Sequence, residues 1–148
     1  MISTKRRNGE IGAMKFLIDT NIILDWLQKR QPFFSDARAV MMRCLFDPTT
    51  LGFVSAHSLC DIFYILRKEF SSETRFQLIH FLSVHFSVIA EGQEDFLIAS
   101  TTQGTTDLED TLQLICAQKM QVDYIVTRNI DDFRHSPVPA ILPQNLPK

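Results

Sequence analysis

Acidic and amide side chains stand beside the ends of predicted elements at three places in this chain. Asp19 follows a short apolar run, Asp107 and Asp110 open a predicted helix, and Asn129 follows a later apolar run. Carboxylate and amide oxygens are ligands of hard divalent cations, and Mg²⁺ keeps several waters beside one or two carboxylates. Such an ion can generate a hydroxide and stabilise the leaving oxygen of a phosphodiester. These residue types therefore indicate metal-assisted hydrolysis of a phosphodiester.

Each acid also has an ordinary structural role as an alternative. Asp19 alone could be a helix N-cap and Asp107 a first-turn acid, because both positions favour a carboxylate. Thr106 and Glu109 have the spacing of a capping box, with Thr106 at the N-cap. The acids at 131–132 could form only a solvated turn. The joint placement of the acids is harder to explain in this way than the placement of any one of them.

Short apolar runs alternate with helical patterns, and this alternation predicts where the acids lie. Strands are expected at 15–18, 51–55, 86–90 and 123–127, with an edge strand at 140–142. Helices are expected at 20–29, 35–46, 56–70, 71–85, 94–102 and 106–120. The pattern predicts an α/β fold with three layers, α/β/α, around a central parallel sheet of about four or five strands. Such sheets bind ligands at the carboxyl ends of their strands.

The chain has the size and composition of one globular domain. Its 148 residues are 45% hydrophobic and 22% charged, and no apolar run is long enough for a membrane span. Residues 1–13 are expected to form an arm, and residues 14–148 a domain that folds without it. Three cysteines without a C-x-x-C pair are typical of reduced thiols in a cytoplasmic protein. A net charge of −2 excludes binding to nucleic acid through overall positive charge alone.

Four blocks of residues follow one another along the chain. They read FLIDTNI at 16–22, SLCDI at 58–62, DLEDTLQ at 107–113 and DYIVTRN at 123–129, followed by Asp132 and Phe133. In this order the blocks resemble those of the PIN domain family, over nearly all of 15–142. The resemblance implies a metal-dependent ribonuclease fold, which is shared with the VapC-type toxins of bacterial toxin–antitoxin pairs.

The resemblance also implies a role for individual residues. Asp19 matches the first acid of the family and Asp110 the third. Asp61 stands where many members have Glu, and Asn129 stands where many have Asp. Asn129 still offers a carbonyl oxygen to a cation, and Asp107 adds a carboxylate. All five are expected to be catalytic, and the expected metal ligands are Asp19, Asp107, Asp110 and Asn129.

The function implied by the resemblance is that of a Mg²⁺- or Mn²⁺-dependent endoribonuclease in the cytoplasm. Its expected partners are RNA, an antitoxin protein and a second copy of the chain in a homodimer. The alternative is a PIN-like module that binds nucleic acid or protein without cleavage, which the neutral Asn129 favours. An aspartate that accepts a phosphoryl group is a more distant alternative, because no lysine lies near the carboxyl end of a predicted strand.

Three further side chains bear on the predicted site. Arg128 is expected beside the acids, in contact with a phosphate. His57 and Cys60 have the spacing of half a zinc site, but no second pair completes it. Both residues are therefore expected to be structural.

Overall fold

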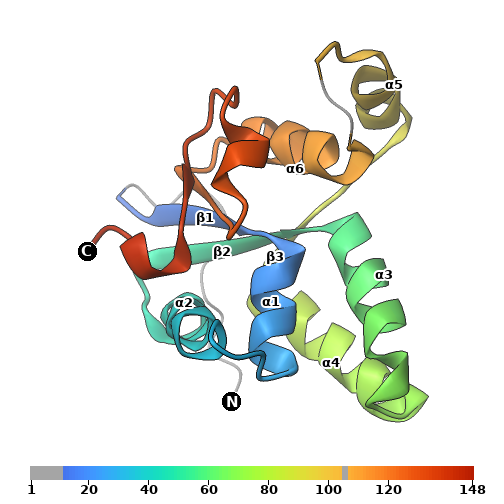
Figure 1. Ribbon diagram of the computed structural model, residues 1–148, viewed down its shortest axis with the longest axis vertical. Coiled ribbons are helices and arrows are strands. Elements are labelled where there is room, and N and C mark those ends of the chain that lie inside the picture. Colours follow the sequence, from blue (N-terminus) through green and yellow to red (C-terminus); the bar gives the residue numbers. More distant parts are fainter. Residues whose placement is uncertain (1–11, 105–106) are drawn as a thin grey trace.

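Five parallel strands form the central sheet of the computed structural model, which describes residues 12–104 and 107–148 (Figure 1). They are β1 (Met14–Ile18), β2 (Thr50–Ser55), β3 (Ser87–Ile89), β4 (Tyr124–Val126) and β5 (Ala140–Ile141), in the spatial order β3-β2-β1-β4-β5. Every neighbouring pair is parallel. The predicted α/β class is confirmed, and all five expected strands are present.

The strand order reverses beside β1. The chain moves outward from β1 to β2 and β3, and then returns to place β4 on the other side of β1. In open α/β sheets, ligands bind at such a reversal, outside the carboxyl ends of the strands. Asp19 directly follows β1, so the fold places this carboxylate at the reversal.

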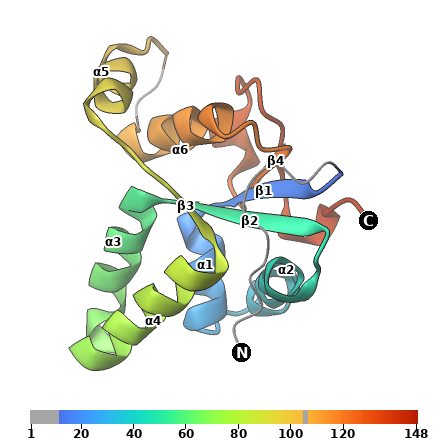
Figure 2. The ribbon, with the colours of Figure 1, turned by 180° about the vertical axis from the view of Figure 1, so that it is seen from behind.

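Helices cover both faces of the sheet (Figures 1 and 2). One side carries α1 (Thr20–Leu27), α2 (Phe34–Phe46), α3 (Ala56–Ile65) and α4 (Ser72–His85), and the other carries α5 (Gln93–Thr101) and α6 (Leu108–Lys119). Short 3-10 segments are η1 (Leu66–Lys68), η2 (Ile130–Phe133) and η3 (Pro143–Asn145). Successive residues of β1 supply both interlayer cores, since Phe16 belongs to one apolar cluster and Leu17 to the other.

Three local features differ from the expectation or extend beyond the described residues. The third helix ends at Ile65 and continues only as η1. The last helix has Asp107 as its N-cap, whereas Thr106, the expected N-cap, lies outside the described residues. Most of the predicted arm, 1–11, also lies outside them, so independence of the fold from the arm stays a prediction. No helix that the structure describes is both long and apolar enough to cross a bilayer.

Gly52 permits a close approach between β2 and the residue that follows α4. A Cβ added at Gly52 would lie 2.6 Å from two ring atoms of Phe86 and 3.1 Å from Cys44 Cβ. Phe86 is 1% exposed, so its ring has little room to move. We expect Gly52→Ala to lower the free energy of unfolding by about 1–3 kcal/mol, measured by urea denaturation.

The control for this prediction is a smaller ring partner. In a Phe86→Leu background, the added methyl group should cost less than it does beside phenylalanine, because the overlap is gone. Equal costs in the two backgrounds would show that Phe86 does not require glycine at position 52.

Candidate metal and active site

Asp19 is fixed by hydrogen bonds from three elements. Its Oδ1 caps α1 by accepting from the Thr20 backbone N–H at 2.9 Å, and it also accepts from Gln113 Nε2 at 3.3 Å. Its Oδ2 accepts from the Thr127 hydroxyl at 2.8 Å, just beyond β4. The residue is 8% exposed, and burial raises the pKa of Asp19 although these hydrogen bonds lower it. A positive charge nearby would stabilise this buried carboxylate.

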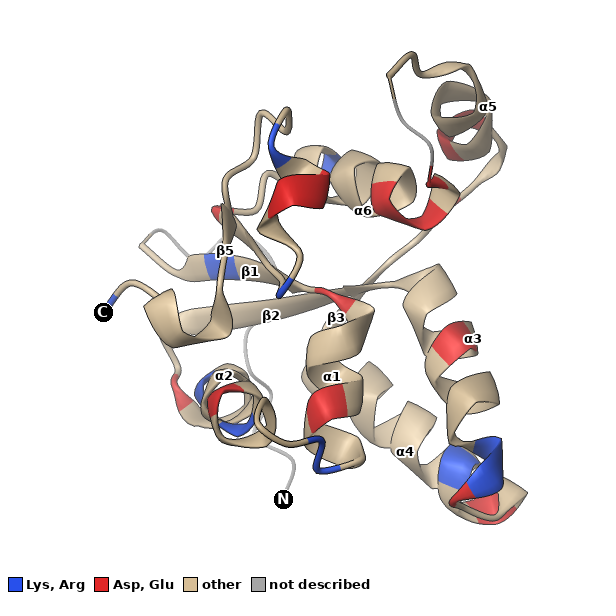
Figure 3. Cartoon of the chain, in the orientation of Figure 1, with Lys and Arg blue, Asp and Glu red and all other residues tan. Residues whose placement is uncertain are grey.

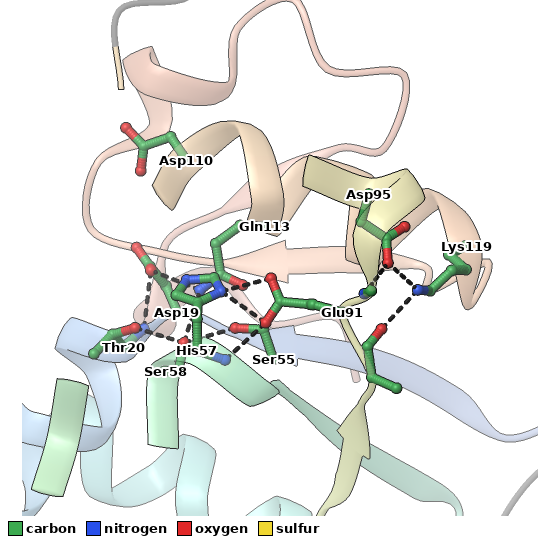
Figure 4. Close-up of polar contacts among 12 residues, drawn as sticks. Asp19, Thr20, Ser55, His57, Ser58, Glu91, Asp95, Asp110, Gln113 and Lys119 are labelled. Carbon is green, nitrogen blue, oxygen red and sulfur yellow. Dashed lines mark hydrogen bonds and ion pairs between the residues drawn. The ribbon is translucent and has the colours of Figure 1, made fainter. Parts of the chain in front are cut away.

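A buried hydroxyl connects the helices around Asp19 (Figure 4). Ser58 Oγ on α3 lies 2.7 Å from Thr20 Oγ1 on α1 and 2.7 Å from Ser55 Oγ at the end of β2. It also accepts from Gln113 Nε2 on α6 at 3.3 Å. The same Gln113 amide therefore donates to both Asp19 and Ser58. It connects α6, on one face of the sheet, with α1 and α3 on the other.

A cavity of about 240 Å³ opens beside Asp19. Its acidic, amide and imidazole side chains come from separate parts of the chain: Asp19, Asn21, His57, Asp61, Glu109, Asp110, Gln113 and Asn129. Within 12–104 and 107–148, no lysine or arginine lines it. Figure 3 shows the concentration of acidic residues at the start of α6. The lining is therefore dominated by negative charge.

Burial and neighbouring negative charge both favour a proton on Asp110. The pKa of Asp110 is raised to about 7, first by burial and then by the negative charges of Asp107, Asp132, Asp19 and Glu109. A divalent cation would relieve this repulsion. The available donors are oxygens, which fit a hard ion such as Mg²⁺ or Mn²⁺. In the described part of the chain, no three His, Cys, Asp or Glu side chains lie close enough to form a ready-made metal cluster. This arrangement fits an ion that keeps several of its waters.

Four of the five predicted site residues line the cavity, and one does not. Asp19, Asp61, Asp110 and Asn129 belong to the lining. Asp107 is the N-cap of α6, where its Oδ1 accepts from the Asp110 backbone N–H at 2.9 Å. It is exposed and acts on the cavity through its charge, which contributes to the raised pKa of Asp110.

A phosphate contact by Arg128 stays a prediction, and in this structure the guanidinium binds another group. Its Nε lies 2.6 Å from Asp25 Oδ2, and its Nη2 lies 3.2 Å from Asp25 Oδ1. The guanidinium also stacks over Phe33, at 3.9 Å from the ring centre. Asp25 is fully buried, so Arg128 is held by the ion pair and turned away from the cavity lining.

Two side chains of the lining, Glu109 and His57, were not among the predicted site residues. Glu109 follows the N-cap too closely for the expected capping box, and its pKa is raised by burial and then by its neighbour Asp61. His57 lies in the lining although a structural role was expected. It stands four residues before Asp61 on α3, so the i, i+4 spacing was a signal that both face the same site.

A comparison with protein families shows which family this chain belongs to. A family model described as PIN domain matches residues 15–131. The chain belongs to the PIN domain family. The match contains both acids that the resemblance placed first and third, Asp19 and Asp110. The comparison with curated proteins gives no match.

Solved structures share the fold of this PIN domain. VapBC-1 from nontypeable Haemophilus influenzae has a TM-score of 0.65 and 18% identity, over 89% of this chain and 100% of the matched chain. VapBC2 from Rickettsia felis, bound to a DNA fragment from the promoter, has a TM-score of 0.63 and 17% identity, over 87% and 98%. A toxin–antitoxin complex from Klebsiella pneumoniae has a TM-score of 0.62 and 23% identity, over 86% and 96%. At these identities the likeness establishes the fold.

Proposed function

We propose that this PIN domain is a Mg²⁺- or Mn²⁺-dependent endoribonuclease. The observation that carries the proposal is the gathering of Asp19, Asp61, Glu109 and Asp110 in one cavity. Burial, and then the neighbouring negative charges, raise the pKa of Asp110 to about 7. The cavity lies beside Asp19, where the strand order reverses. Family membership supports nuclease chemistry in preference to other metal-dependent reactions.

Asp19 and Asp110 would hold the ion, and Asn129 would add a neutral oxygen. Asp61 would act with Glu109, its neighbour in the lining, to orient water or the remaining ligands. Bound Mg²⁺ or Mn²⁺ supplies a lowered pKa for a coordinated water and neutralises charge on the phosphate. Thr20, Thr127 and Gln113 hold the Asp19 carboxylate in place.

The direct test is incubation of RNA with the purified full chain in Mn²⁺, Mg²⁺ or EDTA. We expect internal cleavage with either ion and none in EDTA. Cleavage at an unchanged rate in EDTA would contradict a metal-dependent reaction. Absence of cleavage under all three conditions would favour the second candidate function, a PIN domain that binds without cutting, which the neutral Asn129 supports.

We also propose a cytoplasmic location, an antitoxin partner and a homodimer for this chain. Support for the antitoxin comes from the neighbours, which were solved as toxin–antitoxin assemblies. Large apolar side chains on α3, α4 and α5 remain available for contacts: Tyr64 is 62%, Phe76 66% and Leu97 58% exposed. Light scattering of the pure chain tests the homodimer, and a monomer at all concentrations would contradict it.

Changing Asn129 to Asp should strengthen the metal site. The substitution adds a negative charge to a cavity that already lacks lysine and arginine among its described lining residues. We expect Mn²⁺ affinity, measured by calorimetry, to rise roughly fivefold, since one charge near 4 Å in water is worth about 1 kcal/mol. Stability without metal should fall slightly.

Asn145→Asp provides the matched control, because it adds the same charge at η3, outside the cavity lining. Its Mn²⁺ affinity should equal that of the native chain. An equal gain in both variants would assign the effect to net charge, and no gain in Asn129→Asp would remove Asn129 from the proposed ligands.

A further inference from the structure

The ring of His57 is held by a buried carboxylate from a different part of the chain (Figure 4). His57 Nδ1 lies 2.9 Å from Glu91 Oε1 and 2.8 Å from Glu91 Oε2. The His57 backbone N–H also donates to Glu91 Oε1 at 2.7 Å. The Glu91 side chain is 3% exposed, so its carboxylate is shielded from solvent. These contacts fix the orientation of the imidazole and commit Nδ1 to Glu91.

The other ring nitrogen of His57 is Nε2. Nε2 is buried and has no hydrogen-bond partner among the described residues. The ring lines the cavity that contains Asp19, Asp61 and Asp110. A buried polar atom without a hydrogen bond lowers the stability of the fold. Nε2 therefore stays free for a hydrogen bond to a group that enters the cavity.

His57 also differs chemically from the rest of the lining. The remaining polar side chains there are carboxylates, amides and the hydroxyls of Thr20 and Tyr64, and no described lysine or arginine joins them. Imidazole is the side chain that most readily gives up a proton between pH 5 and 8. A leaving alkoxide from RNA needs such a proton, because it is a strong base.

We propose that His57 is a catalytic residue of this site, with Nε2 protonating the leaving oxygen of the RNA and Glu91 positioning the ring. The inference rests on the proposed ribonuclease function. A water oxygen forms a bond to phosphorus, and the bond from phosphorus to the leaving oxygen breaks with its electron pair on that oxygen. The doubly protonated His57 ring passes its Nε2 proton to the leaving oxygen and keeps its Nδ1 proton on the side of Glu91. The attacking water loses one proton to solvent, and the neutral imidazole regains one from solvent.

The charged groups around His57 come from several elements. Glu91 follows β3 and contacts the ring directly, and Asp61 lies on the same helix. Asp19 and Glu109, from the start of α1 and of α6, interact with the His57 charge through space. All four are acids, which favours a proton donor over an anionic ligand at this position.

Two substrates separate proton donation from other roles of the ring. The full chain and His57→Asn are compared in Mn²⁺ on RNA and on bis-p-nitrophenyl phosphate. The p-nitrophenolate group leaves without a proton, whereas the RNA oxygen needs one. We expect RNA cleavage to fall roughly 10²–10⁴-fold in His57→Asn, and hydrolysis of the nitrophenyl ester to change by less than about threefold.

The outcomes are distinct. RNA cleavage by His57→Asn at the native rate would overturn the inference and leave the proposed function intact. A parallel loss on both substrates would also overturn it, since the ring would then serve binding or folding. If the native chain cleaves no RNA in Mn²⁺, the proposed function and this inference fall together. His80→Asn, on the exposed side of α4, is the control and should cleave both substrates normally.

The role of Glu91 has a readout that does not depend on activity. Nitrogen NMR of the imidazole reports which ring nitrogen carries the proton. We expect a protonated Nδ1 in the native chain and a mixture of ring forms in Glu91→Gln, with RNA cleavage reduced and nitrophenyl ester hydrolysis retained. A neutral native ring with its proton on Nε2 alone, or identical spectra for the two proteins, would overturn the positioning role.

Discussion

Asp19→Asn should abolish most RNA cleavage while the protein stays folded. The amide keeps the size of the carboxylate and can still cap α1, because asparagine is as good an N-cap as aspartate. It removes a buried carboxylate whose pKa is raised by burial. The free energy of unfolding should therefore be equal to or higher than that of the native chain. Loss of a charged ligand should slow cleavage at least about 100-fold, since each tenfold corresponds to about 1.4 kcal/mol.

The measurement pairs RNA cleavage in Mn²⁺ with urea denaturation of the same preparations. Asp131→Asn is the matched control, because it makes the same chemical change at an exposed position on η2 that does not line the cavity. The control should cleave at nearly the native rate. Native activity in Asp19→Asn would show that the reaction takes place elsewhere.

Arg128→Met should destabilise the fold by about 3–5 kcal/mol, the second large effect that we expect. Among the described residues, the substitution leaves the fully buried Asp25 carboxylate with Arg30 as its one basic partner, whose Nη1 is 3.6 Å away. It also removes the stacking on Phe33. Urea denaturation measures the loss, and Arg134→Met, at an exposed site, should cost less than about 0.5 kcal/mol.

A double substitution tests the cause of this loss. In Asp25→Asn with Arg128→Met, no buried charge is left unpaired, so part of the lost stability should return. Additive losses would contradict the ion-pair explanation. Unchanged stability in Arg128→Met, together with weaker RNA binding, would indicate that Arg128 contacts a phosphate.

The sheet could be predicted because its central strands, β1, β2 and β4, are largely buried. The apolar runs at 15–18, 51–55 and 123–127 have few other ways to bury their side chains, and parallel pairing follows from the helices between them. The boundaries of α6 were harder to predict, because Asp107 and Thr106 are both good N-caps. Leu108, the first residue of α6, is 51% exposed.

Within the site, residues at strand ends were predictable and long-range pairs were not. Asp19 could be placed because it follows the central strand, which sets its position directly. The partner of His57 is Glu91, which lies 34 residues later in a connection after β3. No local sequence pattern predicts a contact over that distance. Arg128 stands next to the site in sequence, but its ion-pair partner, Asp25, is 103 residues away. This ion pair holds the guanidinium away from the cavity.

The most direct test of the metal site is Mn²⁺ binding by the native chain, Asp19→Asn and Asp110→Asn, measured by calorimetry at one pH above 7. The two carboxylates come from the starts of α1 and α6 and both line the cavity, so an ion held between them would depend on both. We predict one Mn²⁺ site in the native chain and an affinity at least about tenfold lower in each variant. Equal Mn²⁺ affinity in all three proteins, or tight Zn²⁺ binding without Mn²⁺ binding, would contradict a hard-cation site at these acids.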